Sequence, residues 1–406
     1  MRLFVALFAI AFLFACDDGV ESPGTAADAT VASDVGALTD GELADAGMTS
    51  DATQTADAES GQLDAATDAD TDPGDAELSP DADAVDSGQA ELMPVEPCGD
   101  DLQVVCGSVT PNLGDVPAVD SAGIDPSETG SYDVQTTATQ INGPQGDEIP
   151  ITIYEPYADD EPLAGPLPLV ILLPGFGFSH TGYPHFTEHL ASHGFIVVGA
   201  DVATGGFMEA AVHDEKTAKV LAVLNWAISD SPVANRLDGT RIASVGHSLG
   251  GKLSFYAAAL DSRIDLVVAW DPQNGGGPPC FLGDTGQGSC NDYPVAPNCE
   301  GNDSGIIHQI KAESLTFGAE DLFITPDVHL RADRFYRGAP SPAHFVSMPA
   351  AGHAAWSNGG DVSVLSRGVH TALLLNRMQG VRGLDEWLPG GARLEMAASV
   401  DAVYSK

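Results

Sequence analysis

Residues 241–260 read RIASVGHSLGGKLSFYAAAL and join two hydrophobic patterns through a glycine-rich pentapeptide. The apolar, β-branched run from Ile242 to Val245 predicts a buried strand, and the Ala- and Leu-rich run after the glycines predicts a helix. A serine at the centre of G-x-S-x-G lies on a sharp turn that exposes its hydroxyl above the end of a sheet. Gly246 and Gly250 let strand and helix approach closely. This stretch therefore predicts an α/β domain with Ser248 as a candidate nucleophile.

The same glycines fit two other patterns. In the first, they form an ordinary turn and the hydroxyl of Ser248 caps the following helix. In the second, residues 246–252 form a phosphate loop, because they match G-x-x-x-x-G-K. A phosphate loop needs Ser or Thr directly after the lysine to bind Mg²⁺, and Leu253 occupies that position. The nucleophile interpretation is therefore favoured.

The acidic residues are concentrated before the folded part of the chain. The chain has 59 Asp plus Glu, 16 Lys plus Arg and a formal net charge of −43. Residues 17–97 contain no Lys or Arg, and they have too few large apolar side chains to offset the entropy lost on ordering. We expect a disordered acidic tether there and a folded domain at residues 98–406. The negative charge disfavours nucleic acid and anionic membrane faces as partners.

The first sixteen residues predict export. Arg2 precedes an apolar run, Leu3 to Phe14, that is too short to cross a bilayer, and Ala15 is small, as signal cleavage requires. The sequence LFAC, ending at Cys16, resembles a bacterial lipobox. This resemblance implies a lipid-modified Cys16 that anchors the protein in the cell envelope. The alternative is a plain signal peptide and a secreted protein.

Five further cysteines follow Cys16, and an exported chain retains disulfides. Their number is odd, and their spacings include neither C-x-x-C nor a nearby His ligand, so we expect no zinc site. Three of them lie in a Gly- and Pro-rich insertion at residues 275–305, which we expect to form a stiffened rim or partial lid. Their pairing is open. These cysteines are Cys98, Cys106, Cys280, Cys290 and Cys299.

Continuous apolar runs alternate with helical patterns through most of the folded domain. This alternation predicts a mostly parallel sheet with helices on both faces, and ligands collect at the carboxyl ends of such strands. The expected strands are Tyr132 to Thr139, Pro150 to Tyr154, Leu167 to Leu173, Phe195 to Asp201, Arg241 to Gly246, Ile264 to Asp271, Glu313 to Phe317 and His344 to Met348.

The turn PGFG at residues 174–177 follows one of these strands and exposes backbone N–H groups. Acyl transfer needs two such donors for the oxyanion of its intermediate, and we assign them to the amides of Phe176 and Leu249. The alternative is a purely structural turn, because proline and glycine are common in turns.

A serine nucleophile needs a base and an acid that orients the base. His353 follows a late strand, where a triad in the chain order Ser, Asp, His has its histidine. Asp271 and Asp321 each end a strand, and either could orient the imidazole. Four other histidines lie in or beside one helix, and we expect partly exposed residues or contacts at the rim of the site. They are His180, His185, His189 and His193.

Several motifs resemble the α/β-hydrolase superfamily. LASHGFIVV at residues 190–198, GHSLGGK at residues 246–252 and DPQNGGGPP at residues 271–279 resemble chlorophyllase-like and platelet-activating-factor-acetylhydrolase-like esterases. In those esterases the triad acid follows the strand after the nucleophile. This resemblance implies Asp271 as the acid.

Two other features look like bacterial cutinase-type polyester hydrolases. These are PGF at residues 174–176 and the Phe335-Tyr336 pair. In that family the acid lies one strand later, which implies Asp321. The sequence departs from the family pattern here, because Pro326 comes five residues after Asp321 rather than four. We favour Asp271.

Together these features lead us to expect an exported serine carboxylester hydrolase that works through an acyl-enzyme. Ser248 is the expected nucleophile, His353 the base and Asp271 the orienting acid. The expected substrate is a small-molecule or polymeric ester, and the chemistry requires no cofactor and no metal. The alternative is a catalytically silent binding or scaffold protein with the same fold, because folds outlast their chemistry.

Overall fold

The computed structural model describes the domain that carries these motifs. The described residues are 107–202, 213–273, 307–319 and 332–406, apart from 112, 114, 115, 122 and 358. All of them lie in one compact unit, Ser87–Lys406. The predicted signal and tether, the six cysteines, the insertion at residues 275–305 and Asp321 fall outside the described residues.

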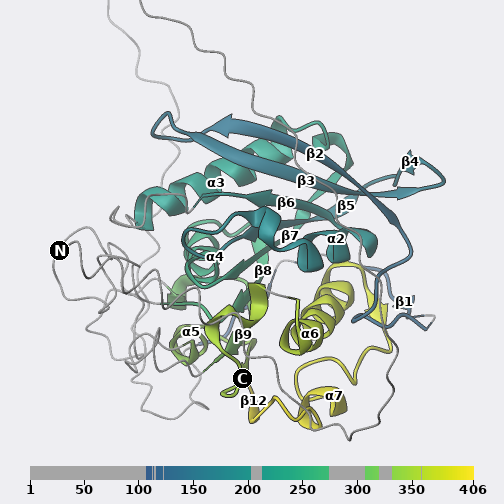
Figure 1. Ribbon diagram of the computed structural model, residues 1–406, viewed down its shortest axis with the longest axis vertical. Coiled ribbons are helices and arrows are strands. Elements are labelled where there is room, and N and C mark those ends of the chain that lie inside the picture. The colour runs from purple at the N-terminus through teal and green to yellow at the C-terminus, as the bar shows by residue number, and fades with distance from the viewer. Residues whose placement is uncertain are drawn as a thin grey trace, which may run out of the picture. The chain divides into compact units, whose positions relative to one another are not determined.

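In the described part of the chain, ten strands form one twisted sheet (Figure 1). Its parallel part runs in the order β10, β9, β8, β7, β5, β6. These strands are β5 (Leu167–Leu173), β6 (Ile196–Ala200), β7 (Leu237–His247), β8 (Ile264–Trp270), β9 (Glu313–Gly318) and β10 (Ala343–Ser347). The mostly parallel sheet expected from the sequence is confirmed.

Antiparallel strands extend this sheet at both edges. β3 (Glu148–Ala158) pairs with β6 and carries β2 (Asp133–Asn142) and the short β4 (Glu161–Pro162), while β12 (Ala402–Ser405) pairs with β10. A separate parallel pair joins β1 (Val119–Asp120) to β11 (Val381–Arg382). All eight expected strands are present, Leu167–Leu173 with its expected ends and the other seven with shifted ends, whereas the two-residue strands and β12 were not expected from the sequence.

Helices pack on both faces of the sheet (Figure 1). One face packs against α3 (His213–Ser229), α4 (Leu249–Leu260) and α5 (Asp333–Gly338), and the other against α2 (Pro184–Ser192) and α6 (Asp361–Met378). The remaining helices are short: α7 (Ala392–Glu395) and the 3₁₀ turns η1 (His180–Gly182), η2 (Ala234–Arg236), η3 (Ile307–Gln309) and η5 (His353–Ser357). No helix within the described ranges is both long and apolar enough to span a bilayer.

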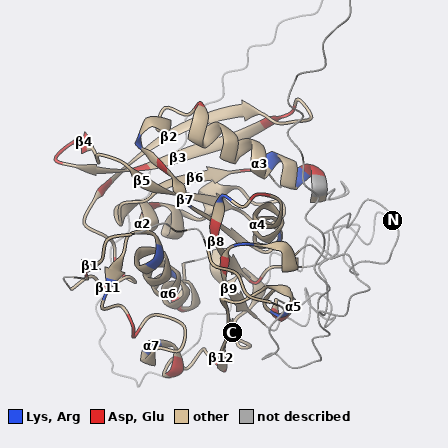
Figure 2. Cartoon of the chain, turned by 180° about the vertical axis from the view of Figure 1, so that it is seen from behind, with Lys and Arg blue, Asp and Glu red and all other residues tan. Residues whose placement is uncertain are grey.

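The strand β5 shows why the sheet needs helices on both faces. Leu169, Ile171 and Leu173 belong to the core on the side of α3 and α4, whereas Val170 and Leu172 belong to the core on the side of α2 and α6. Successive strand side chains point to opposite faces, so a continuous apolar run has no face suited to water. β5 and β6 carry no charged residue and are tan throughout in Figure 2.

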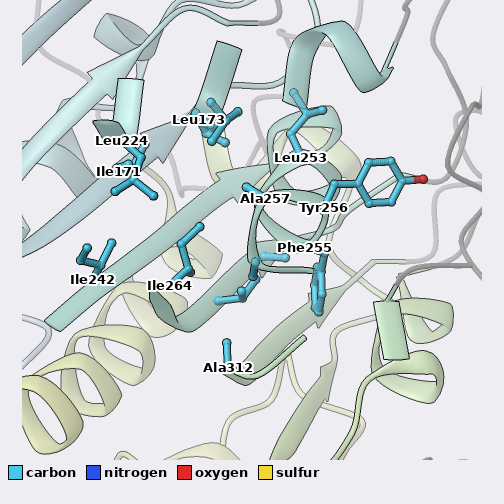
Figure 3. Packing of buried hydrophobic residues seen from close by; sticks show 14 of the residues in the cluster. Ile171, Leu173, Leu224, Ile242, Leu253, Phe255, Tyr256, Ala257, Ile264 and Ala312 are labelled. Atoms are coloured by element: carbon cyan, nitrogen blue, oxygen red, sulfur yellow. The ribbon is translucent and has the colours of Figure 1, made fainter. Parts of the chain in front are cut away.

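Helix α4 fixes the position of the glycine-rich pentapeptide against this sheet. Leu253 and Ala257 of α4 lie in the same buried cluster as Ile242 of β7 and Ile264 of β8 (Figure 3). All four side chains are fully buried. Burying a leucine or isoleucine side chain contributes roughly 1.5–3 kcal/mol, so this packing holds the start of α4 firmly at the end of β7.

Candidate active site

Ser248 lies on a strained turn between β7 and α4. Its backbone has φ 54° and ψ −120°, in the positive-φ region that side chains rarely adopt. The turn is tight, because a Cβ on Gly246 would collide with the backbone of Gly250, and a Cβ on Gly250 would collide with the carbonyls of Leu173 and Pro174. The glycines therefore allow the sharp reversal that holds the Ser248 hydroxyl at the carboxyl edge of the sheet.

Asp271 follows the last residue of β8, the strand beside β7. Its side chain is fully buried, and its backbone also has a positive φ of 43°. The N–H of Ala319 donates to Oδ1 at 3.0 Å, and Nε2 of Gln273 donates to Oδ2 at 3.2 Å. These donors fix the carboxyl group with Oδ2 directed toward His353.

His353 opens η5, shortly after β10, and lies between the serine and the aspartate. Its Nδ1 is 2.6 Å from Oδ2 of Asp271, and its Nε2 is 2.9 Å from Oγ of Ser248. A carboxylate can only accept, so Nδ1 carries the hydrogen and Nε2 is left to accept from the serine hydroxyl. His353 and Ser248 are 8% and 9% exposed, which leaves this hydrogen-bonded series mostly sheltered from water.

The turn after β5 lies directly against the nucleophile. A Cβ added to Gly175 would approach Cβ of Ser248 to 3.4 Å. The predicted oxyanion donor Phe176 is the next residue along this turn. Leu249, the other predicted donor, is the first residue of α4, and the first N–H groups of a helix have no acceptor within the helix. Leu249 therefore follows Ser248 in the chain, and Phe176 follows Gly175, whose backbone lies close to the Ser248 side chain.

Three of the four other histidines are more deeply buried than the sequence suggested. His180, His189 and His193 are 2%, 5% and 7% exposed. Nε2 of His189 lies 2.9 Å from the carbonyl of Pro126, and Nε2 of His193 lies 3.0 Å from the carbonyl of Glu128. The chain segment before β2 contacts α2 at the rings of His189 and His193. The expectation that they are partly exposed is wrong.

The ionisation of these histidines follows from burial. Burial, reinforced by the nearby His193 and Arg367, lowers the pKa of His189 to about 2. Burial likewise lowers the pKa of His193. A carbonyl partner does not compensate for the lost hydration of an imidazolium, so both rings are neutral near neutral pH.

His180 has a different role and contacts a carboxylate. Its Nδ1 is 2.7 Å from Oδ1 of Asp201, which follows β6, and its Nε2 is 2.8 Å from Oγ1 of Thr152. Burial acts to raise the pKa of Asp201, but the hydrogen bonds from His180 outweigh burial and lower it. This pair fixes the end of the turn that begins at Pro174, and it does not contact Ser248.

A family model described as PET hydrolase-like matches residues 114–276. Among individual relatives, chlorophyllase-1 of Arabidopsis thaliana is 30% identical over 178 residues, which are 38% of this chain and 53% of the relative. Cutinase est1 of Thermobifida alba is 32% identical over 102 residues, 25% of this chain and 32% of the relative. Bis(hydroxyethyl) terephthalate hydrolase of Streptomyces coelicolor is 28% identical over 123 residues, 30% of this chain and 37% of the relative.

The matched region ends shortly after Asp271, so it includes the turn after β5, Ser248 and Asp271 but not His353. The chain spans about half the length of the chlorophyllase and about a third of the two bacterial relatives, 53%, 32% and 37%. The resemblance and the sheet topology agree with the expectation from the motifs. Residues 114–276 are similar to the PET hydrolase-like family, and the mostly parallel sheet with helices on both faces is consistent with the α/β-hydrolase superfamily.

Proposed function

We propose that this protein is an exported serine carboxylester hydrolase that forms an acyl-enzyme on Ser248. The observation that carries the proposal is the series of two hydrogen bonds, 2.9 Å from Ser248 Oγ to His353 Nε2 and 2.6 Å from His353 Nδ1 to Asp271 Oδ2. Such a series converts an unreactive hydroxyl into a nucleophile.

In the acylation step, Ser248 Oγ attacks the ester carbonyl carbon while its proton passes to His353 Nε2. The carbonyl π electrons move onto oxygen, and the amides of Phe176 and Leu249 donate to this oxyanion. Asp271 places a negative charge beside the imidazolium that forms. When the tetrahedral intermediate collapses, the C–O bond to the alcohol breaks, and the proton on Nε2 leaves with the alcohol.

In the deacylation step, water replaces the alcohol. His353 Nε2 accepts a proton from the water as its oxygen attacks the acyl carbon, and the proton then returns to Ser248 Oγ as the acid leaves. All protons are exchanged between substrate, water and these side chains. The cycle therefore needs no cofactor and no metal.

The proposed substrate class is a carboxylic ester, as a small molecule or within a polymer. The relatives are named for cutin, terephthalate and chlorophyll chemistry, and the reaction these names share is ester hydrolysis. Because each relative is matched over only part of its length, the relatives together support the reaction class rather than any one ester substrate. The acyl and alcohol parts need direct measurement.

A panel of p-nitrophenyl and aryl esters tests this proposal. The wild-type protein should hydrolyse short acyl esters and react with a fluorophosphonate probe, and Ser248→Ala should lose both. Ser254→Ala is a matched control, because Ser254 lies in α4, the helix that follows Ser248, but hydrogen-bonds to Ser244 and Gly250. Labelling that persists in Ser248→Ala, or a wild-type protein inert to all esters and to the probe, would contradict the proposal.

We also propose that Cys16 anchors the exported protein through lipid. Cells that express the full chain should incorporate labelled palmitate into it, and Cys16→Ala should abolish this label and move the protein into the soluble fraction. A wild-type protein that is soluble and unlabelled would show that LFAC is only a cleavage site.

A further inference from the structure

His247, which precedes the nucleophile, is held between two other parts of the active site. Its Nδ1 is 2.8 Å from the hydroxyl oxygen of Tyr183, and its Nε2 is 2.8 Å from the backbone carbonyl oxygen of His353. The same tyrosine oxygen lies 3.2 Å from the amide nitrogen of Gly175. Tyr183 is fully buried, and His247 is 2% exposed.

These distances fix every hydrogen in the series. The carbonyl of His353 can only accept, so Nε2 of His247 carries a hydrogen. The neutral ring then has an unprotonated Nδ1, to which the hydroxyl of Tyr183 donates. The tyrosine oxygen remains able to accept from the N–H of Gly175. Each of these donors therefore has an acceptor, and the other neutral tautomer of His247 would leave Nε2 and the carbonyl of His353, two acceptors, face to face.

We propose that Tyr183 and His247 form a positioning bridge that holds the oxyanion turn and the His353 backbone in register with Ser248. One end of the bridge holds Gly175, the residue before the predicted oxyanion donor Phe176, and the other end holds the backbone of the predicted base. His247 is covalently linked to the nucleophile between them. This inference rests on the proposed hydrolase function, and it adds two residues that touch neither the substrate nor the reacting atoms.

The space around Gly175 supports this role. A Cβ at Gly175 would lie 3.2 Å from Nδ1 of His247 and 3.5 Å from the Tyr183 oxygen, so the turn is packed directly onto the bridge. The rings of His247 and His353 are also in contact, with centroids 4.8 Å apart. A shift of the His247 ring would therefore displace both the oxyanion turn and the imidazole.

The bridge also keeps a second charge away from the reacting imidazole. Burial, and secondarily the neighbouring His353, lowers the pKa of His247 well below its ordinary value. During the proposed turnover His353 becomes an imidazolium, and a second cation in contact with it would oppose that step. A neutral His247 with two fixed hydrogen bonds avoids this repulsion.

Three variants test the bridge in the full-length protein. Tyr183→Phe removes one oxygen, His247→Phe removes both ring nitrogens, and His247→Gln retains one acceptor and one donor at similar separation. Tyr154→Phe is the matched control, since it removes another buried tyrosine hydroxyl, on β3. The readouts are kcat and KM for a small aryl ester, the rate of fluorophosphonate labelling and the thermal midpoint.

We expect kcat to fall about 10- to 100-fold in Tyr183→Phe and His247→Phe, with KM changed less than about 3-fold, because misplacement of reacting groups affects the chemical step. The labelling rate should fall in parallel. His247→Gln should recover a large part of kcat. The double variant Tyr183→Phe/His247→Phe should be no slower than the worse single variant, because the two residues act as one unit.

The bridge is overturned if Tyr183→Phe, folded by its thermal midpoint and circular dichroism, keeps kcat within about 2-fold of wild type. It is also overturned if Tyr154→Phe loses as much kcat as Tyr183→Phe, or if the two single losses multiply in the double variant. Because Tyr183→Phe removes a single atom, it tests the bridge even if His247→Phe does not fold. An inactive wild-type protein would instead refute the proposed function.

Discussion

The two ends of β8 each carry a buried aspartate, and the two carboxyl groups have different surroundings. Asp271, after the carboxyl end, faces an amide N–H, the amide of Gln273 and the imidazole of His353. Asp265, near the amino end, accepts one hydrogen bond among the described residues, at 3.3 Å from the N–H of Ile242. Burial, opposed weakly by this bond, raises the pKa of Asp265 to about 7. The two ends of β8 therefore differ in the number of directed partners that each buried carboxyl group has.

A third buried acid lies at the same amino edge of the sheet as Asp265. It shows that the hydrogen-bond partners of an acid, rather than its position in the sheet, set the direction of its pKa shift. Glu313, the first residue of β9, faces Nε of Arg377 at 2.6 Å and Nε2 of His344 at 3.1 Å. Burial acts to raise its pKa, but the hydrogen bonds from these two side chains outweigh burial and lower it. Asp265 and Glu313 are 3% and 2% exposed, so the hydrogen bonds from Arg377 and His344, not the degree of burial, account for the opposite pKa shifts.

The two edges of the sheet also differ in what the hydrogen-bond partners of each buried acid contact in turn. Glu313 is fully occupied by structural partners, whereas Asp271 holds a histidine whose other nitrogen reaches Ser248. Loops after parallel strands converge at the carboxyl edge, and they can bring a base and a nucleophile to one acid. The predictions below change these three acids, with Asp321 as a control.

Asp271→Asn should give the largest effect. The asparagine amide can donate toward Nδ1 of His353, which favours the tautomer with the hydrogen on Nε2 and prevents that nitrogen from accepting the serine proton. We expect kcat for a small ester to fall about 10⁴-fold with KM little changed, as in other serine triads. Steady-state kinetics at neutral pH, with folding checked by circular dichroism, measures it.

Asp321→Asn is the matched control for this loss. Asp321 lies outside the described residues, and the sequence alone left it as the alternative acid. We expect kcat to stay within about 10-fold of wild type, because a carboxyl that does not orient the base acts only indirectly. A folded Asp321→Asn that is inactive, next to an active Asp271→Asn, would assign the acid to the later strand.

Glu313→Gln should lower stability rather than activity. The substitution leaves Arg377 and His344 without an anionic partner, and removing one member of a buried ion pair is strongly destabilising. The Arg377 side chain is 36% exposed and can recover some hydration, so we expect a loss of about 3 kcal/mol in the free energy of unfolding at pH 7. Urea unfolding measures it. Unchanged stability would show that the contacts of Glu313 with Arg377 and His344 make no net contribution to the free energy of unfolding.

The parallel core could be predicted from the sequence because its strands are much more apolar than the turns that flank them. Leu167–Leu173 was predicted with its observed ends, since seven apolar residues lie between proline- and glycine-containing turns. β12 was missed because its four residues, AVYS, form a strand by pairing with β10 rather than through a pattern of their own. Its neighbours in space are about 60 residues away, at His344↔Ser405.

The geometry around Ser248 could be predicted only where a motif encodes it. G-x-S-x-G encodes a local turn, so Ser248 could be found from adjacent residues. The residue pattern alone did not separate Asp271 from Asp321, and only a family resemblance favoured Asp271, because the choice depends on where the histidine loop returns. Tyr183 and His247 were missed as partners because their contact joins residues 64 positions apart, and no short pattern specifies such a contact. The histidine within the pentapeptide was the one available signal.

Asp265→Asn should give the smallest effect, and in the stabilising direction. The folded pKa of Asp265, about 7, lies above the ordinary value of 3.8, so the folded protein retains a proton that the unfolded chain releases. The stabilisation that this bound proton gives the folded state is therefore fully present below pH 3.8 and is lost as the pH rises through about 7. At pH 8 the wild type must either bury a charge or rearrange, whereas asparagine stays neutral.

We expect Asp265→Asn to raise the free energy of unfolding by about 1 kcal/mol at pH 8, since the amide also brings a donor that needs a partner. The gain should disappear by pH 5, where the wild-type carboxyl is protonated in the fold. Urea unfolding at pH 5, 6, 7 and 8 tests this, with Asp401→Asn at an exposed site as the control. A stabilisation that is independent of pH would mean that the gain comes from the amide rather than from the absent charge. A destabilisation at pH 8 would mean that the carboxylate is ionised and well solvated, and the contrast between the two ends of β8 would no longer hold.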